Sequence, residues 1–211
     1  MTDVTMNGAV SPATYPDRLR LFEIASEQGG YFTAEQARAS GYSFAVLSHH
    51  VRSGRFVRVR RGLYRLREYP SFPRDEVLVA WLAAGKDVAV ISHESALDLL
   101  DLSDVIPDAV HLTVPRSRRY LPAAPGVKIH TTERLIRPTD RTIRGGMVIT
   151  SAARTILDAA EAGTAPEQIE MAVAQAVERG MVLPDQLRRD AAERGRRVAT
   201  LIEGALIKVA A

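Results

Sequence analysis

The sequence predicts an α+β fold, in which a compact N-terminal segment precedes a mixed α/β domain with a small sheet and a helical C-terminus. Three observations lead to this prediction. Short helix signals alternate with glycines in the first third of the chain, two runs of alternating apolar and charged residues flank Arg61-Gly62, and short apolar segments are interleaved with helical ones after Pro73.

The first helix is expected from Pro16-Asp17 through Gln28. Proline in the first turn and Gly29-Gly30 after the last are typical of helix ends. Its buried side is predicted to comprise Leu19, Phe22, Ile24 and Ala25. Tyr31-Phe32 then forms a short connecting segment whose rings pack under the elements that follow, whereas residues 1–14, which are small and polar, form a loose tail.

Two short helices come next. Thr33 followed by Gln36 is the capping-box pattern, in which two side chains satisfy free backbone donors reciprocally. Gly41 ends this helix, and Ser43 begins a second one over Phe44–Arg52, which ends at Ser53-Gly54.

A β-hairpin follows these helices. Residues 56–60 (FVRVR) and 63–66 (LYRL) alternate apolar and charged side chains on either side of a glycine-containing turn. Helix, tight turn, helix and hairpin is the order of a winged helix-turn-helix, in which the second helix lies in the major groove of DNA.

The predicted second helix has one apolar face and one polar face. Val46, Leu47, His50 and Val51 share a stripe that is expected to pack inward, which leaves the opposite face free to enter a groove. Arginines follow in quick succession, and no Asp or Glu interrupts them between Ser40 and Arg67. Neutralising DNA phosphates with such residues releases counterions, so that binding becomes strong and salt-dependent. The predicted DNA-binding residues are Ser43, Phe44, Ser48, His49, Arg52, Arg55, Arg58, Arg60, Arg61 and Arg65.

Composition offers a simpler explanation of the same charges. The chain has only three lysines among its 28 basic residues, so arginine-rich usage alone enlarges every basic patch, and a run of charges is usually a solvated face. The distribution of charge nevertheless favours polyanion binding by the first third. Residues 1–70 carry a net charge of +4 and the remainder −1.

A domain boundary is expected at residues 68–73, because two prolines within four residues disfavour both helix and strand. The predicted division is therefore a DNA-binding domain over residues 1–70 and an α+β domain over residues 71–211. In the second domain we expect a helix over 75–84 with Trp81 in the core, a strand at 88–91, and a helix over 96–102 capped by Ser92. Strands are predicted at 109–114, 127–131 and 147–150, and helices at 151–162, 166–179, 184–193 and 198–209.

Several classes of protein are disfavoured by what the sequence contains. There are no cysteines, and no stretch is long and apolar enough for a membrane span or a signal peptide, so a cytoplasmic protein without membrane contact is expected. No P-loop, dinucleotide-binding glycine pattern or HExxH motif is present. We therefore expect no cofactor.

Candidate catalytic groups are few. The five histidines are scattered along the chain, so no metal site is predicted. His93 with Glu94 suggests acid–base chemistry, but neighbours on a helix point about 100 degrees apart, and no positioned partner for a general base can be identified. The chain is therefore predicted not to be an enzyme. A basic loop at Arg116, Arg118 and Arg119 is a secondary candidate for contact with nucleic acid or an acidic partner.

Five segments together resemble the AbiEi family of antitoxins from type IV toxin–antitoxin systems. They are VRSGR and FVRVRRGLYRL at 51–66, ISHESALDLL at 91–100, VHLTVPRSRR at 110–119 and VITSAARTILDAA at 148–160. The resemblance extends from about Pro16 to Ala162. It implies a bacterial, cytoplasmic autorepressor that binds its own operator DNA. It also implies a C-terminal domain that counteracts a nucleotidyltransferase-fold toxin, in several members without a stable complex.

Two alternatives to the antitoxin remain open from the residues alone. One is a winged-helix transcriptional regulator whose second domain binds a small ligand. The other is a nucleic-acid-processing enzyme that the winged helix directs to its substrate, with the basic loop and the His93-Glu94 pair as its candidate site.

Overall fold

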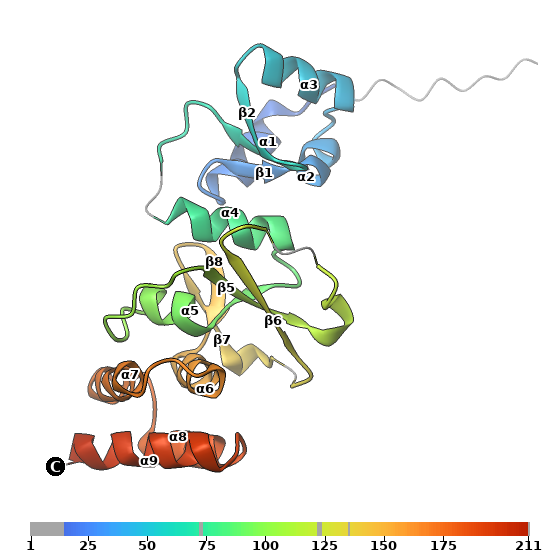
Figure 1. Cartoon of the computed structure of the whole chain (residues 1–211). Coiled ribbons are helices and arrows are strands. Elements are labelled where there is room, and N and C mark those ends of the chain that lie inside the picture. The colour runs from blue at the N-terminus through green and yellow to red at the C-terminus, as the bar shows by residue number, and fades with distance from the viewer. Residues whose placement is uncertain (1–14, 72–73, 122–123, 135, 211) are drawn as a thin grey trace, which may run out of the picture. The chain divides into compact units, whose positions relative to one another are not determined.

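The computed structural model describes residues 15–71, 74–121, 124–134 and 136–210. It has the predicted α+β composition, and its helices and strands are shown in Figure 1. Contacts within the chain divide it into two compact units, residues 1–70 and 71–211, which are called unit 1 and unit 2 below. The tail expected over residues 1–14 lies outside the described residues.

Within its described residues, unit 1 has three helices and a three-stranded antiparallel sheet. The helices are α1 (Arg18–Ser26), α2 (Ala34–Ala39) and α3 (Phe44–Arg52). The strands are β1 (Tyr31–Thr33), β2 (Phe56–Arg60) and β3 (Leu63–Leu66), in the order β1-β3-β2. The predicted helix-turn-helix and hairpin are both present, so unit 1 is a winged helix-turn-helix.

Local capping explains why these helices begin where they do. Thr33 Oγ1 accepts a hydrogen bond from Gln36 N at 3.2 Å, and Gln36 Oε1 accepts one from Thr33 N at 2.8 Å, which confirms the predicted capping box. Ser43 Oγ accepts from Val46 N at 3.3 Å and caps α3. Each such cap is worth about 1 kcal/mol, so the start of α3 is fixed by its own sequence.

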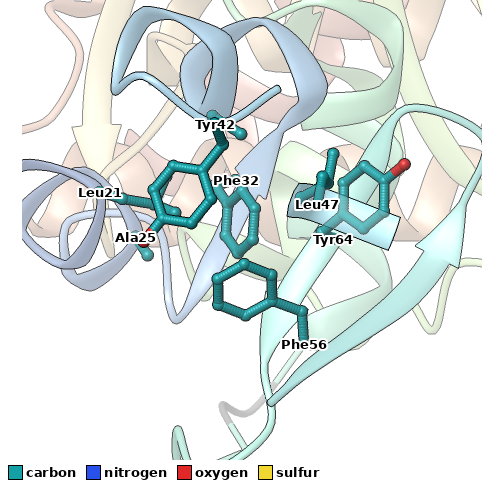
Figure 2. Packing of buried hydrophobic residues seen from close by; sticks show 8 residues of the cluster. Leu21, Ala25, Phe32, Tyr42, Leu47, Phe56 and Tyr64 are labelled. Carbon is teal, nitrogen blue, oxygen red and sulfur yellow. The ribbon is translucent and has the colours of Figure 1, made fainter. Parts of the chain in front are cut away.

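An aromatic core joins the sheet to the helices of unit 1. Figure 2 shows Phe32 in the middle of this cluster, with Phe56 and Tyr64 close to it. The Phe32 and Phe56 rings meet edge to face at 5.0 Å, and Phe32 stacks on Tyr64 at 5.8 Å. Aromatic pairs of this kind contribute about 0.5–1.5 kcal/mol beyond the burial of their area.

Two predictions for unit 1 are wrong. Tyr31 and Phe32 belong to strand β1, which pairs with β3, rather than to a connecting segment. The buried face of α1 was also misassigned. Leu19 and Phe22 are 68% and 53% exposed, whereas Leu21 is 1% exposed and packs in the core. The reason is that three apolar side chains at 19, 21 and 22 spread around the helix, so their spacing alone does not select one face.

Gly30 connects α1 to the sheet at a place where only glycine fits. Its φ is +86°, and a Cβ at this position would lie 2.4 Å from Tyr69 Cγ. The Tyr69 hydroxyl also donates a hydrogen bond to Ser26 O at 3.1 Å. The end of unit 1 is thus folded back onto the end of α1.

Unit 2 has a five-stranded mixed sheet and six α-helices within the described residues. The helices are α4 (Asp75–Ala84), α5 (His93–Leu99), α6 (Ala152–Ala162), α7 (Pro166–Glu178), α8 (Pro184–Ala192) and α9 (Arg196–Ala210). The strands are β4 (Val90–Ile91), β5 (Val110–Pro115), β6 (Val127–Thr132), β7 (Arg141–Arg144) and β8 (Met147–Thr150). Two short 3₁₀ helices, η1 (Arg116–Arg118) and η2 (Pro138–Asp140), complete the unit.

The sheet has the order β6-β5-β4-β8-β7. The pairs β5–β6 and β4–β8 are parallel, whereas β4–β5 and β7–β8 are antiparallel. Because β6 pairs with β5 in parallel, His130 lies beside Thr113, and His111 beside Lys128. This register decides which polar side chains meet.

Most predicted elements of unit 2 are confirmed, with two corrections. Strand β7 was missed, because its residues Arg141–Arg144 are mostly charged and it lies at the edge of the sheet. Helix α5 begins at His93 rather than Ala96 and ends at Leu99. Trp81 is buried as predicted, and its Nε1–H donates to Ala89 O at 2.8 Å. None of the described helices could span a bilayer, being too short or too polar.

Candidate functional site

Helix α3 presents the polar face that the sequence predicts. Leu47 and His50 are buried against the core, whereas Phe44, His49 and Arg52 are exposed and Ser48 is half-buried. Phe44 is 81% exposed although it is aromatic, because it lies in the first turn of α3, beyond the core. An exposed apolar ring beside polar side chains is suited to contact with a base or sugar.

His50 occupies a position where an aliphatic core residue is expected. Its ring lies 4.9 Å from that of Phe56 and 5.7 Å from that of Tyr42. Its Nδ1 is buried without a hydrogen-bond partner. Burial, and then the positive charge of Arg55, lowers the pKa of His50, so the ring is neutral at physiological pH and acts as a flat core side chain.

Five arginines on or just after α3 and on the hairpin carry unpaired charge. Within the described residues, the side chains of Arg52, Arg55, Arg58, Arg60 and Arg61 have no hydrogen-bonded or ion-paired partner. All are exposed except Arg60, which is half-buried. Their guanidinium groups are therefore available to an anionic partner.

Register and a β-bulge separate the hairpin arginines. Arg58 pairs with Tyr64, and paired residues share a face, so Arg58 lies on the face that carries the aromatic core. Arg60 pairs with Leu63 because the register shifts after Arg58, and Val59 is the extra residue of the bulge. Simple alternation would place Arg58 and Arg60 on the same face. Because of the bulge, Arg60 lies on the opposite face.

Arg65 also lies on the face opposite to Arg58, and it is engaged inside unit 1. Its Nη2 donates to Tyr69 O at 2.7 Å, and its guanidinium lies 5.5 Å from the centre of the Tyr31 ring. Nine of the ten predicted DNA-binding residues thus have accessible side chains. They lie on α3, at its N-cap, just after it or on the hairpin. The fold gives Arg65 a structural role between β1 and the end of unit 1.

The basic loop of unit 2 is partly neutralised. Arg116 forms an ion pair with Glu133. Arg119 donates to the Tyr120 hydroxyl at 3.0 Å and lies 4.4 Å over that ring. Arg118 is exposed and has no partner in the described part of the chain. The three arginines therefore offer much less free charge than the α3–hairpin surface.

A second site, missed from the sequence, lies in unit 2. His93, His111 and His130 are far apart in the chain, but a ring nitrogen of each lies within 4.8 Å of a ring nitrogen of the others. Parallel pairing of β5 with β6 places His111 and His130 on one face of the sheet, since Thr113 pairs with His130 and His111 is two residues away. His93 follows β4, which pairs with β5. These three histidines are therefore scattered in the sequence but adjacent in the fold.

The three imidazoles are neutral at physiological pH. Burial and then the neighbouring His130 and His111 lower the pKa of His93 to about 2. Burial followed by His111 lowers the pKa of His130 to about 4. The pKa of His111 is also lowered by burial, although Glu94 opposes the shift. Neutral rings keep one nitrogen lone pair each, which can accept a hydrogen bond or bind a metal ion.

A polar cavity of about 460 Å³ opens beside these rings, and its lining includes His93, His130, Arg154, Asp158 and Arg194. Asp158 is 5% exposed and holds two arginines. It accepts from Arg154 Nε at 2.7 and 2.9 Å and from Arg194 Nη1 at 2.7 Å. His93 thus has the polar neighbours that the sequence did not reveal.

Comparisons with known proteins agree with this architecture. Residues 19–67 match the family model described as transcriptional regulator, AbiEi antitoxin, so the family resemblance is confirmed for this segment, which lies within the winged helix-turn-helix. Among solved structures, the crystal structure of the RV2827C protein from Mycobacterium tuberculosis has a similar fold. Its TM-score is 0.61 at 16% identity, and the match covers 95% of this chain and 81% of that chain. A search of curated proteins gives no match.

Unit 1 has the winged helix-turn-helix fold, and its residues 19–67 are similar to the AbiEi antitoxin type of transcriptional regulator. Proteins of this description are transcriptional regulators, which are not usually enzymes. The likeness to the mycobacterial structure extends the fold comparison over both units.

Proposed function

We propose that unit 1 binds operator DNA with α3 in the major groove and the β2–β3 hairpin on neighbouring phosphates. The observation that carries this proposal is the set of five unpaired arginines around α3 and the hairpin, beside the exposed groove face of the helix. Ser43, Phe44, Ser48, His49 and Arg52 are assigned to the bases and the adjoining backbone. Arg55, Arg58, Arg60 and Arg61 are assigned to phosphates. Arg65 is left out, because its guanidinium is bonded within unit 1.

Unit 2 provides an internal contrast that supports this assignment. It has 15 arginines against 10 in unit 1. Many of them are paired with carboxylates, as in Arg74–Asp98, Arg134–Glu161 and Arg188–Glu203. Arginine-rich composition alone would give paired and unpaired arginines throughout the chain. The lack of partners around α3 and the hairpin therefore supports selection for an external polyanion.

Binding to a promoter fragment of the protein's own gene, followed by fluorescence anisotropy, tests the proposal. Arg52→Ala should weaken binding to the promoter by about 1–3 kcal/mol relative to a scrambled duplex, because it removes a base contact. Arg58→Ala should weaken binding to both duplexes by similar factors, because phosphates carry no sequence information. Arg144→Ala removes the same charge from an exposed position in unit 2 and serves as the matched control. Equal effects of all three substitutions would refute the assignment.

We also propose that the protein is the antitoxin of an AbiE-type pair, that it represses its own operon, and that unit 2 counteracts a cognate nucleotidyltransferase-fold toxin. The family match over residues 19–67 and the resembling segments of unit 2 support this proposal. Co-expression of the neighbouring gene with the full chain, and with a version lacking residues 71–211, separates the two roles. Rescue of growth by the full chain alone would support the assignment to unit 2, whereas equal rescue by both would oppose it.

The cavity of unit 2 favours a second candidate, a regulator that responds to a small ligand. Arg154 uses its Nε for Asp158, and its Nη1 lies 3.9 Å from Asp140, too far for a hydrogen bond, so its terminal amino groups have none within the described residues. A ligand with an anionic group would satisfy them. Thermal-shift screening of anionic metabolites tests this candidate, and promoter binding in the presence of any hit shows whether the ligand regulates DNA affinity.

A further inference from the structure

The spacing of the three histidines is that of metal ligands. His111 Nδ1 and His130 Nε2 lie 3.3 Å apart, and His93 contributes a third nitrogen within 4.8 Å of both. Bonds of about 2.0–2.1 Å to a tetrahedral Zn²⁺ place neighbouring ligand atoms about 3.3 Å apart. These two nitrogens are hydrogen-bonded to each other at a spacing close to that of zinc ligands, so one of them must lose its proton before both can bind an ion.

A hydroxyl group lies behind His93, and two carboxylates lie near His111. His93 Nδ1 is 2.8 Å from Ser92 Oγ, which accepts a hydrogen bond from the Thr113 hydroxyl at 2.7 Å. A ring nitrogen of His111 lies within 4.8 Å of carboxylate oxygens of Glu94 and Asp108. Metal-bound histidines usually direct their second nitrogen to such a hydroxyl, carbonyl or carboxylate group. His111 Nε2 is buried without a hydrogen-bond partner, so this ring is not yet satisfied by the protein alone.

We propose that His93, His111 and His130 bind one divalent transition-metal ion, for which Zn²⁺ is the best match. Imidazole nitrogen is a preferred ligand of zinc and of its neighbours in the first transition row. Three protein ligands leave a fourth position, which is the arrangement of reactive rather than purely structural zinc sites. His93 and His130 line the cavity that also contains Arg154, so the fourth position faces this guanidinium, where water or a small oxyanion can complete the coordination.

Ion binding requires one ring to turn. The His93 and His130 rings are stacked, with centroids 3.6 Å apart and planes 15° apart, and stacked rings direct their lone pairs along nearly parallel lines. His130 is half-buried on β6, which is the edge strand of the sheet. Its ring therefore has more room to rotate than that of His93, which is buried. The inference is independent of the proposed DNA binding, because it concerns unit 2 alone.

The site is tested with the full-length, tag-free protein. The protein is first treated with EDTA and exchanged into metal-free buffer, and is then titrated with Zn²⁺. Isothermal titration calorimetry should give one Zn²⁺ per chain. Co²⁺ should give the visible absorption of a low-symmetry four-coordinate ion. Loss of a residue that only hydrogen-bonds to a metal ligand reduces affinity by about 10–100-fold. His130→Ala removes a ligand itself, so the affinity for Zn²⁺ should fall by more than this. His49→Ala removes an exposed histidine of unit 1 and should leave the affinity unchanged.

A second variant distinguishes loss of a ligand from damage to the fold. His130→Cys supplies a thiolate in place of the imidazole and should restore Co²⁺ binding, with a sulfur-to-metal charge-transfer band that a structural role cannot produce. The proposal is overturned if the wild-type protein shows no saturable binding of Zn²⁺ or Co²⁺. It is also overturned if the His130→Ala variant binds Zn²⁺ as tightly as wild type. If Glu94→Gln then abolishes binding, the ion lies among the carboxylates rather than among the three histidines.

Discussion

Replacing Asp158 by asparagine tests whether unit 2 depends on its buried ion pairs. The Asp158 carboxylate accepts hydrogen bonds from Arg154 Nε and from Arg194 Nη1, and all three side chains are buried. Asparagine keeps the size of the side chain but removes its charge. Arg154 would then keep only the carboxylate of Asp140, 3.9 Å away, whereas Arg194 would keep its ion pair with Glu161.

The expected loss is large. Removing one partner of a buried ion pair typically costs about 3–5 kcal/mol, because the other charge stays buried without compensation. For Asp158→Asn a loss within this range is expected, because Arg154 would lose its close carboxylate while Arg194 would keep Glu161. A typical domain has only about 5–15 kcal/mol of stability in total, so the variant should be partly unfolded at modest concentrations of urea.

Urea unfolding followed by the fluorescence of Trp81 measures the loss, because this tryptophan is the only one in the chain and is buried in unit 2. Glu203→Gln is the matched control. Its partner Arg188 is 46% exposed, so water and salt screen this pair and its loss should change the stability little. A loss for Asp158→Asn no larger than for the control would show that water screens the Asp158 pairs, and the description of a buried network would be wrong.

Three further predictions concern unit 1. Gly30→Ala should destabilise it by about 1–3 kcal/mol in thermal unfolding, because the new Cβ is strained and too close to Tyr69. In the control Gly62→Ala, no atom lies within 4 Å of the new Cβ, so the cost should be only about 1 kcal/mol. If the four arginines assigned to phosphates each neutralise one charge, the slope of log K against log salt should be about −3.6 and should change to about −2.7 in Arg58→Ala, and an unchanged slope would contradict that contact. Burial and Arg55 lower the pKa of His50, so the unfolded chain binds its proton more readily. This contribution to stability is fully present above the unfolded-state pKa of 6.5 and is lost as pH falls below it. His50→Leu should remove up to about 1.4 kcal/mol per pH unit of that dependence in urea unfolding at decreasing pH.

Unit 1 was largely predictable because its signals are local. The capping box at Thr33 and Gln36, the cap at Ser43 and the turn at Gly62 each act within four residues, so the sequence alone defines where the elements begin and end. The buried face of α1 was not predictable, because its selection depends on contacts with distant residues in the core. The bulge at Val59 was hidden for a similar reason, since pairing with β3 creates it.

The histidine cluster could not be located from sequence spacing, because it depends on a register. His111 and His130 meet only because β5 and β6 are parallel and because Thr113, rather than a neighbour, pairs with His130. A shift by one residue would turn one ring to the other face of the sheet. The available signal was weak: two predicted strands each carry one histidine, and His93 directly follows a third.

The two units show why a count of arginines does not predict a binding surface. The sequence places basic residues in both units, and a run of them favours a solvated face as readily as a site. What distinguishes them is the position of the acidic residues in the folded chain. In unit 2, Asp158 and Glu161 lie within hydrogen-bonding distance of Arg154, Arg194 and Arg134, so these charges stabilise the protein itself. Around α3 no described carboxylate comes so close to the arginines. An anionic partner can therefore gain binding free energy by neutralising them. The arginines around α3 are therefore available to DNA because they lack internal partners, which only the folded structure reveals.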